Sequence, residues 1–149
     1  MANSKLRLIA LYDSTGADLS DQFSSFAIVT AEPDSSAVTF AAARNGGGDD
    51  WSMTATISQD HTTGSVWDQC WTNPGDEWTG YYAPGTSSVT DLADASATTP
   101  IFEFTATISR PRGTILGGDA NTSLSAIATT DIEWQLTGQP TKHTTAITP

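Results

Sequence analysis

The chain has 149 residues, a length that suits one domain with a hydrophobic core of its own. It carries 17 acidic and 6 basic residues, a net charge of −11, which argues against a protein that reads nucleic-acid sequence through a basic face. The hydrophobic share is 38%, the charged share is 15%, and there are 12 Gly and 7 Pro, which together favour an all-β protein.

Cysteine usage and the first residues bear on the compartment. The single cysteine, Cys70, excludes a disulfide within the chain and fits a reducing cytoplasm. The start of the chain lacks a long apolar stretch, so we expect neither a signal peptide nor a membrane span.

Alternating apolar residues predict two early strands. The first runs from Leu6 to about Leu11, and turn residues follow at Asp13 to Gly16. The second follows Ser20-Asp21-Gln22 and has apolar residues on both faces from Phe26 to Thr30. We therefore expect this second strand to be covered on both sides.

A glycine-rich connection then runs from about residue 33 to residue 50. Consecutive glycines lose much conformational entropy on ordering, so the segment is either a floppy connection or an arm that orders on a partner. If the segment is an arm that orders on a partner, Val38 and Phe40 are its anchors. The residues of this candidate assembly loop are Val38, Phe40, Arg44, Gly46, Gly47, Gly48, Asp49 and Asp50.

The clearest half-buried strand runs from Trp51 to Ser58, where apolar and small polar residues alternate. His61 follows it beside Asp60, a pair that invites a catalytic or metal-binding interpretation. We expect neither, because His143 lies in a polar tail and no nucleophile motif or second ligand at a suitable spacing accompanies the pair. The sequence predicts no enzyme activity, no cofactor and no metal.

One short helix is predicted after Ser65, a good N-cap with Asp68 three residues on. Val66, Trp67, Cys70 and Trp71 repeat with helical spacing, and Asn73-Pro74-Gly75 ends the helix. A strand follows around Trp78 to Tyr82. We expect Trp67 and Trp71 to be buried as a plug at the end of the β core, with a sugar-stacking platform as the open alternative.

The remaining chain predicts a surface loop, two strands and a tail. Gly85 to Thr99 is the loop, and Ile101 to Ile108 is a strand with Phe102, Phe104, Ala106 and Ile108 on one face. Ser123 to Gly138 is a second long strand with a bend or bulge at Thr129-Thr130-Asp131. The polar segment from about residue 139 to 149 is expected to be a mobile or partner-bound tail.

Five segments, taken in order, resemble a known family. They are Ser20-Asp21-Gln22, Val38-Thr39-Phe40-Ala41 with the glycine loop and Gln59-Asp60, Ser65 to Gly75, Pro100 to Phe102 with Pro111 to Ala120, and Ile132 to Thr141. Their succession is similar to the major tail protein, the tail-tube subunit, of long-tailed bacteriophages. The likeness is greatest to versions from phages of Gram-positive and actinobacterial hosts.

The resemblance implies an all-β fold, an antiparallel β-sandwich or partly closed barrel with one short α-helix and extended loop and terminal arms. Subunits of the family form rings, usually hexameric, whose sheets join into a β-barrel around a lumen, and the rings stack through a long loop and terminal arms. The implied partners are other copies of the chain, other phage tail proteins and DNA in passing, with no membrane. The implied location is the virion tail, after synthesis in the bacterial cytoplasm. The Gly85 to Thr99 insert departs from the resemblance, and an outer decoration of the tube is one reading of it.

The acidic balance suits a lumen that DNA passes without sticking. Glu103 is the lumen candidate, a lone acid that faces away from Phe102 and Phe104, and the alternatives are a solvated outer residue or a pair with Arg110 or Arg112 across an interface. The other polar positions of the two best strands are Ser52, Thr54, Thr56, Thr105 and Thr107.

Two other function classes stay open. One is a capsid-decoration or other virion surface protein, which is also a small β domain. The other is a carbohydrate-binding β-sandwich, suggested by Trp51, Trp67, Trp71 and Trp78. The carbohydrate reading ranks last, because helical spacing predicts that Trp67 and Trp71 point inward.

Overall fold

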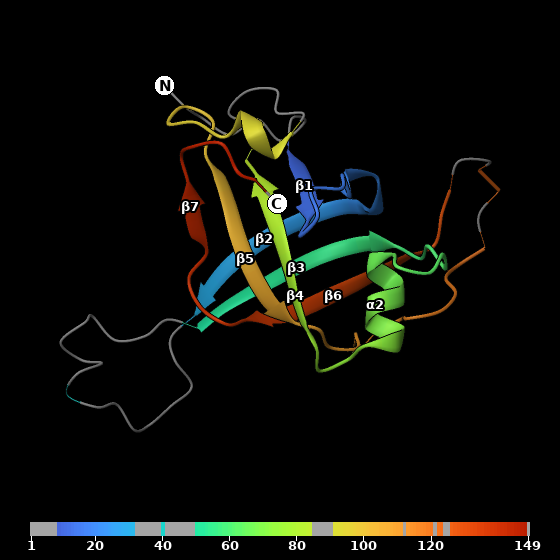
Figure 1. Ribbon diagram of the computed structural model, residues 1–149. Helices are drawn as coiled ribbons and strands as arrows, with labels where there is room; N and C mark the ends of the chain where they lie inside the picture. The colour runs from blue at the N-terminus through green and yellow to red at the C-terminus, as the bar shows by residue number, and fades with distance from the viewer. Residues whose placement is uncertain are drawn as a thin grey trace.

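The computed structural model describes residues 9–31, 40, 50–84, 91–111, 113–120, 122–123 and 126–148 (Figure 1). Within these residues the chain is mostly β, with one short α-helix, and every strand pairing is antiparallel. The predicted fold class is confirmed. The elements are β1 Ala10–Asp13, η2 Ser20–Gln22, β2 Phe23–Ala31, β3 Asp50–Ser58, α2 Val66–Thr72, β4 Glu77–Ala83, η3 Leu92–Asp94, β5 Ile101–Thr107, β6 Thr129–Leu136 and β7 Thr141–His143.

The sheet bends into two layers. Its strand order is β1-β4-β5-β6-β3-β2, and β7 pairs with β5. β5 and β6 share only two residue pairs, at Ala106 and Thr107, so the sheet turns there. In Figure 1 β4 and β5 run across β2, β3 and β6, the crossed packing of an open sandwich.

The main core lies between the two layers, where inward-facing residues alternate with outward-facing ones. Met53 and Ile57 come from one layer and Phe104 from the other, and all three are buried. The helix α2 adds Val66 and Cys70 to the same cluster. The helix therefore covers one end of the sandwich, as the apolar spacing of its residues predicts.

A second, smaller core lies on the outer face of the β1-β4-β5 layer. Tyr81 and Ile101 face outward there and are nevertheless buried. Leu92 of η3 and Ile147 near the C-terminus cover them, and the Ile147 amide donates to the Leu92 carbonyl at 3.2 Å. The predicted loop and the predicted tail thus contribute to packing in this layer.

The structure corrects the predicted C-terminal tail. Thr141–His143 forms β7, which pairs with β5, and Ile147 is buried in the second core. A three-residue polar strand shows no alternation long enough to recognise in a sequence. Its partner strand lies about 40 residues earlier, which no local pattern reveals.

Three strand predictions also change. Among the described strands β2 lies at an edge with one face exposed, and Val29 is 42% exposed, so the expectation of cover on both sides is wrong. β6 begins at Thr129 rather than Ser123, and its pairing with β3 runs in continuous register without the expected bulge. β1 covers Ala10–Asp13, and the residues before Ile9 lie outside the described part of the chain.

Candidate functional site

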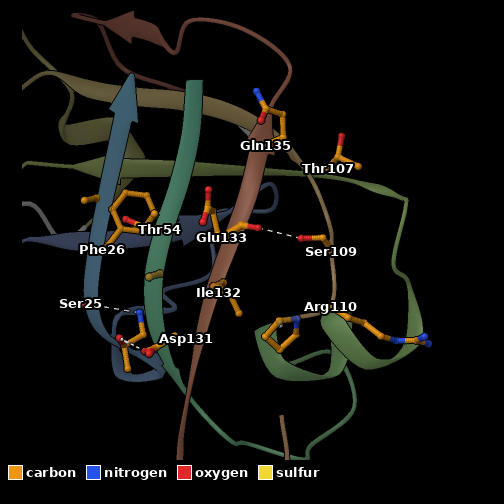
Figure 2. A pocket seen from close by; sticks show the side chains of 14 residues that line it. Ser25, Phe26, Thr54, Thr107, Ser109, Arg110, Asp131, Ile132, Glu133 and Gln135 are labelled. Carbon is orange, nitrogen blue, oxygen red and sulfur yellow. Dashed lines mark hydrogen bonds between the residues drawn. The ribbon is translucent and has the colours of Figure 1, made fainter. Parts of the chain in front are cut away.

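The outer face of the β2-β3-β6 layer is an open surface on which polar side chains lie beside apolar ones, including the exposed Val29. It forms a shallow groove of about 810 Å³, bounded on one side by Ser109, Arg110 and Pro111 (Figure 2). We call this surface the polar sheet face and define it by Ser25, Ala27, Thr54, Thr56, Asp131, Glu133 and Gln135. No described element lies over it, in contrast to the outer face of the other layer.

Alternation in β3 and β6 puts these side chains outward. Residues 53, 55 and 57 of β3 and residues 132, 134 and 136 of β6 are buried, so the residues between them face solvent. The register sets Thr54 beside Glu133 and Thr56 beside Asp131. Figure 2 shows Asp131, Glu133 and Gln135 along one strand, at the centre of the groove.

Side-chain hydrogen bonds fix the polar sheet face. The Thr56 hydroxyl donates to Asp131 Oδ1 at 2.7 Å, and the Thr56 amide donates to Ser25 Oγ at 3.1 Å. The Ser109 hydroxyl donates to the Glu133 carbonyl at 2.9 Å, which ties the wall of the groove to β6. The face is therefore ordered as well as polar, because neighbouring strands hold each other's side chains.

The charge of this face is acidic. Asp131 and Glu133 carry its carboxylates, and Arg110 lies at the rim, where its guanidinium Nη2 donates to the Trp71 carbonyl at 3.3 Å. The described residues contain no group of three or more His, Cys, Asp or Glu side chains placed to hold a metal ion. The hydroxyls and carboxylates of this face are groups that water solvates well.

Asp131 and Glu133 were not among the residues proposed from the sequence. The signal was present, since Asp131, Glu133 and Gln135 alternate with Ile132, Trp134 and Leu136. Thr54 and Thr56, by contrast, lie on a polar strand face as expected.

Glu103 lies on a different surface from the polar sheet face. It is on β5, and its carboxylate Oε2 lies 2.9 Å from His143 Nε2 of β7, a partner that was not considered from the sequence. The Tyr81 ring is next to His143, with 6.4 Å between ring centroids. Burial raises the pKa of the Tyr81 hydroxyl, and the Glu103 carboxylate raises it further. Glu103 thus belongs to a partly buried cluster that anchors β7.

Trp67 and Trp71 differ in burial. Trp67 is 6% exposed, and its indole Nε1 donates to the Ile115 carbonyl at 2.7 Å, so its predicted burial is confirmed. Trp71 is 48% exposed, and the prediction that it plugs the core is wrong. At about 100° per residue, Trp71 lies about 40° farther from Val66 around the helix than Trp67 does, so it passes beyond the rim of the core.

The helix begins as its sequence predicts. Ser65 is the N-cap, and its hydroxyl accepts from the Asp68 amide at 3.1 Å. The Asp68 carboxylate accepts in turn from the Gly64 amide at 3.0 Å. This reciprocal pair fixes the entry of the chain into α2 and with it the position of both tryptophans.

Most of the candidate assembly loop lies outside the described residues, namely Val38, Arg44, Gly46, Gly47, Gly48 and Asp49. Phe40 is described and is 91% exposed. Asp50 is the first residue of β3. The role of this loop in assembly stays a prediction.

Asp60 and His61 take part in local structure. The Thr62 amide donates to Asp60 Oδ1 at 3.0 Å, and hydrogen bonds from Thr62 lower the pKa of the Asp60 carboxyl. The His61 ring lies edge-on against Trp67, with 4.3 Å between centroids. These contacts explain both residues by turn geometry and packing.

No protein-family model matches the chain, and comparisons with curated proteins and with solved structures give no significant match. In the described part of the chain, no helix has the length and apolar character needed to cross a membrane. The fold and the polar sheet face therefore carry the functional argument.

Proposed function

We propose that the chain is a structural virion protein, a tail-tube subunit whose copies form stacked rings around a channel for DNA. The observation that carries this proposal is the polar sheet face, an ordered acidic surface that no described element covers. A face of this kind suits the wall of a water-filled channel. The proposal also draws on the resemblance in the order of sequence motifs.

The edge of the same layer offers a route to assembly. Within the described residues, β2 pairs with a strand on one side only, and it is nine residues long. An open strand edge presents unpaired backbone groups that join readily to another strand. A second copy joined at this edge would extend the layer, and the polar sheet faces of neighbouring copies would then form one continuous inner wall.

Electrostatics favours this face as the channel wall. Duplex DNA carries one negative charge per roughly 1.7 Å of axis, so basic side chains along a channel would retain it through many contacts. Asp131 and Glu133 put negative charge on the polar sheet face instead. They fit the wall better than Glu103 does, because the Glu103 carboxylate is paired with His143.

Electron microscopy of the purified chain tests the proposal. We expect rings or tubes of uniform width, alone or with a phage tail-length protein as template. Val29→Pro and Thr30→Pro form a matched pair, because successive N–H groups of a strand point to opposite edges. The variant whose proline removes an N–H that faces β3 should lose a backbone hydrogen bond and unfold at a lower temperature. The variant whose proline removes an N–H at the open edge should keep its fold and stop assembling. Normal tubes from both variants would contradict assembly through β2.

A capsid-decoration protein or other virion surface protein is the alternative structural role. Such a protein would stay a monomer or small oligomer until capsids are added. Co-sedimentation with capsids, without tubes at any protein concentration, would favour it over the tail tube. Under either role the protein would be made in the bacterial cytoplasm, join the virion and act without catalysis or a cofactor.

A further inference from the structure

Trp71 is the exposed end of a row of three aromatic rings beside the main core. His61 lies edge-on to Trp67, and Trp67 lies nearly parallel to Trp71, with 5.5 Å between centroids and 13° between ring planes. Trp67 is buried and anchored through its indole nitrogen to the Ile115 carbonyl. Trp71 is therefore held in one orientation by a fixed neighbour while 48% of it stays exposed.

Fixed polar groups lie beside this ring. Asp68 is three residues earlier on α2, a spacing that makes the two side chains neighbours on the helix surface. Its carboxylate oxygens accept from the Gly64 amide at 3.0 Å and the Thr72 hydroxyl at 3.1 Å, which orients the carboxylate. Arg110 approaches from another segment and donates to the Trp71 carbonyl. The residue with the exposed indole thus has an acceptor at a neighbouring helix position and a donor bound to its backbone carbonyl.

The surroundings select the chemical class of ligand. A chain with net charge −11 and a carboxylate at the ring disfavours anions. The Arg110 guanidinium beside the same residue disfavours a cation over the indole. A neutral ligand meets both conditions, and one with a C–H-rich face for the indole and hydroxyls for the two polar groups is a pyranose sugar.

We propose that Trp71, Asp68 and Arg110 form a binding site for a neutral glycan. The positively polarised C–H groups of one sugar face lie on the negative face of the indole. Hydroxyls of the sugar donate to the Asp68 carboxylate and accept from the Arg110 guanidinium, both of which have further hydrogen-bonding capacity. The carbohydrate hypothesis ranked last because Trp71 was predicted to point inward. The exposure of Trp71 removes that objection for this residue. The inference does not rest on the tail-tube function.

Isothermal titration of the full chain tests the site with three probes: cellohexaose, maltohexaose and the hexamer of N-acetylglucosamine. We expect saturable binding of at least one probe and no binding of an anionic galacturonate oligomer. Trp71→Ala should weaken binding at least about tenfold, and Trp71→Phe should restore part of it. Ile127→Ala is the control, since it removes an exposed apolar side chain that is not on α2 and should leave affinity unchanged.

Two results would overturn the site. One is the absence of binding to all three neutral probes, and the other is equal affinity in Trp71→Ala and the parent. If Trp71→Ala stops self-assembly and the parent binds no glycan, the ring serves contact between copies instead. Tubes without glycan binding would refute this inference alone, whereas glycan binding without tubes would refute only the proposed assembly.

Discussion

Replacing Trp67 and Trp71 separately by alanine measures how differently the two rings contribute to stability. Trp67 is buried, so Trp67→Ala removes core contacts and leaves a cavity, at a cost of about 3–5 kcal/mol. It also removes the donor to the Ile115 carbonyl. Trp71→Ala removes mainly the stacking contact with Trp67, which is worth about 0.5–1.5 kcal/mol.

Melting temperatures should separate the two variants clearly. For a domain of this size, 1 kcal/mol corresponds to roughly 2–4 °C. We therefore expect a fall of about 6–20 °C for Trp67→Ala and about 1–6 °C for Trp71→Ala. Thermal and urea unfolding followed by far-ultraviolet circular dichroism are the suitable assays, because they do not depend on the tryptophan signal that the substitutions change. The dependence of the unfolding free energy on urea should stay constant.

Trp67→Phe is the control for this pair. It keeps a ring in the core and removes the indole N–H. Its decrease in the free energy of unfolding should therefore fall between those of the two alanine variants. If Trp71→Ala destabilises the protein as much as Trp67→Ala, the helix packs differently from the arrangement described above. The assignment of Trp71 to the surface would then be wrong, and the proposed glycan site with it.

Three further measurements test packing and ionisation. Gly80→Ala should destabilise the fold by about 1–3 kcal/mol in urea unfolding, because an added Cβ would come within 2.6 Å of the Trp78 ring and 3.0 Å of Phe104; wild-type stability would show that these rings move freely. Burial raises the pKa of the Cys70 thiol to about 11. The folded state then holds the proton more tightly than the unfolded state, so stability is lost as pH rises from about 9 to about 11, and Cys70→Ala should flatten this part of a pH titration of stability. Ile147→Ala should lower stability by about 2–4 kcal/mol, whereas a neutral result would mean that the C-terminal segment does not cover the second core.

The strongest local patterns were read correctly from the sequence. In β3 the alternation of Met53 and Ile57 with polar residues predicts one buried face. In α2 the cap residue Ser65 predicts the start of the helix, and Asn73 marks its end. These features depend on residues only a few positions apart, so the sequence carries enough information to place them.

Long-range pairing could not be read in the same way. Apolar residues on both faces of β2, such as Val29, do not tell whether another layer covers the strand. Leu92 is one apolar residue in a polar loop, and nothing near it in sequence indicates that Ile147 will cover the same surface. Burial in these places follows from the order of strands in the sheet.

Only part of the candidate site could be predicted, because some of its contacts depend on long-range strand pairing. The polar face of β3, with Thr54 and Thr56, follows from alternation. The contact between Thr56 and Asp131 requires the pairing of β3 with β6, two segments about 75 residues apart. Glu103 was recognised as the lone acid of its strand, but its partner His143 lies on β7, which has no sequence signal of its own.

The two outer faces of the sandwich differ in a way that bears on assembly. Tyr81 and Ile101 on one face are apolar enough that exposure would be unfavourable, and the chain covers them with its own Leu92 and Ile147. The face that carries Asp131 has no such requirement, because hydroxyls and carboxylates are well solvated in water. If copies join through β2, a wetted inner face allows the subunit to be stable before assembly and the channel to remain hydrated afterwards. The same difference favours the layer that the described residues leave bare as the wall of the proposed channel, rather than the layer that the C-terminal segment covers.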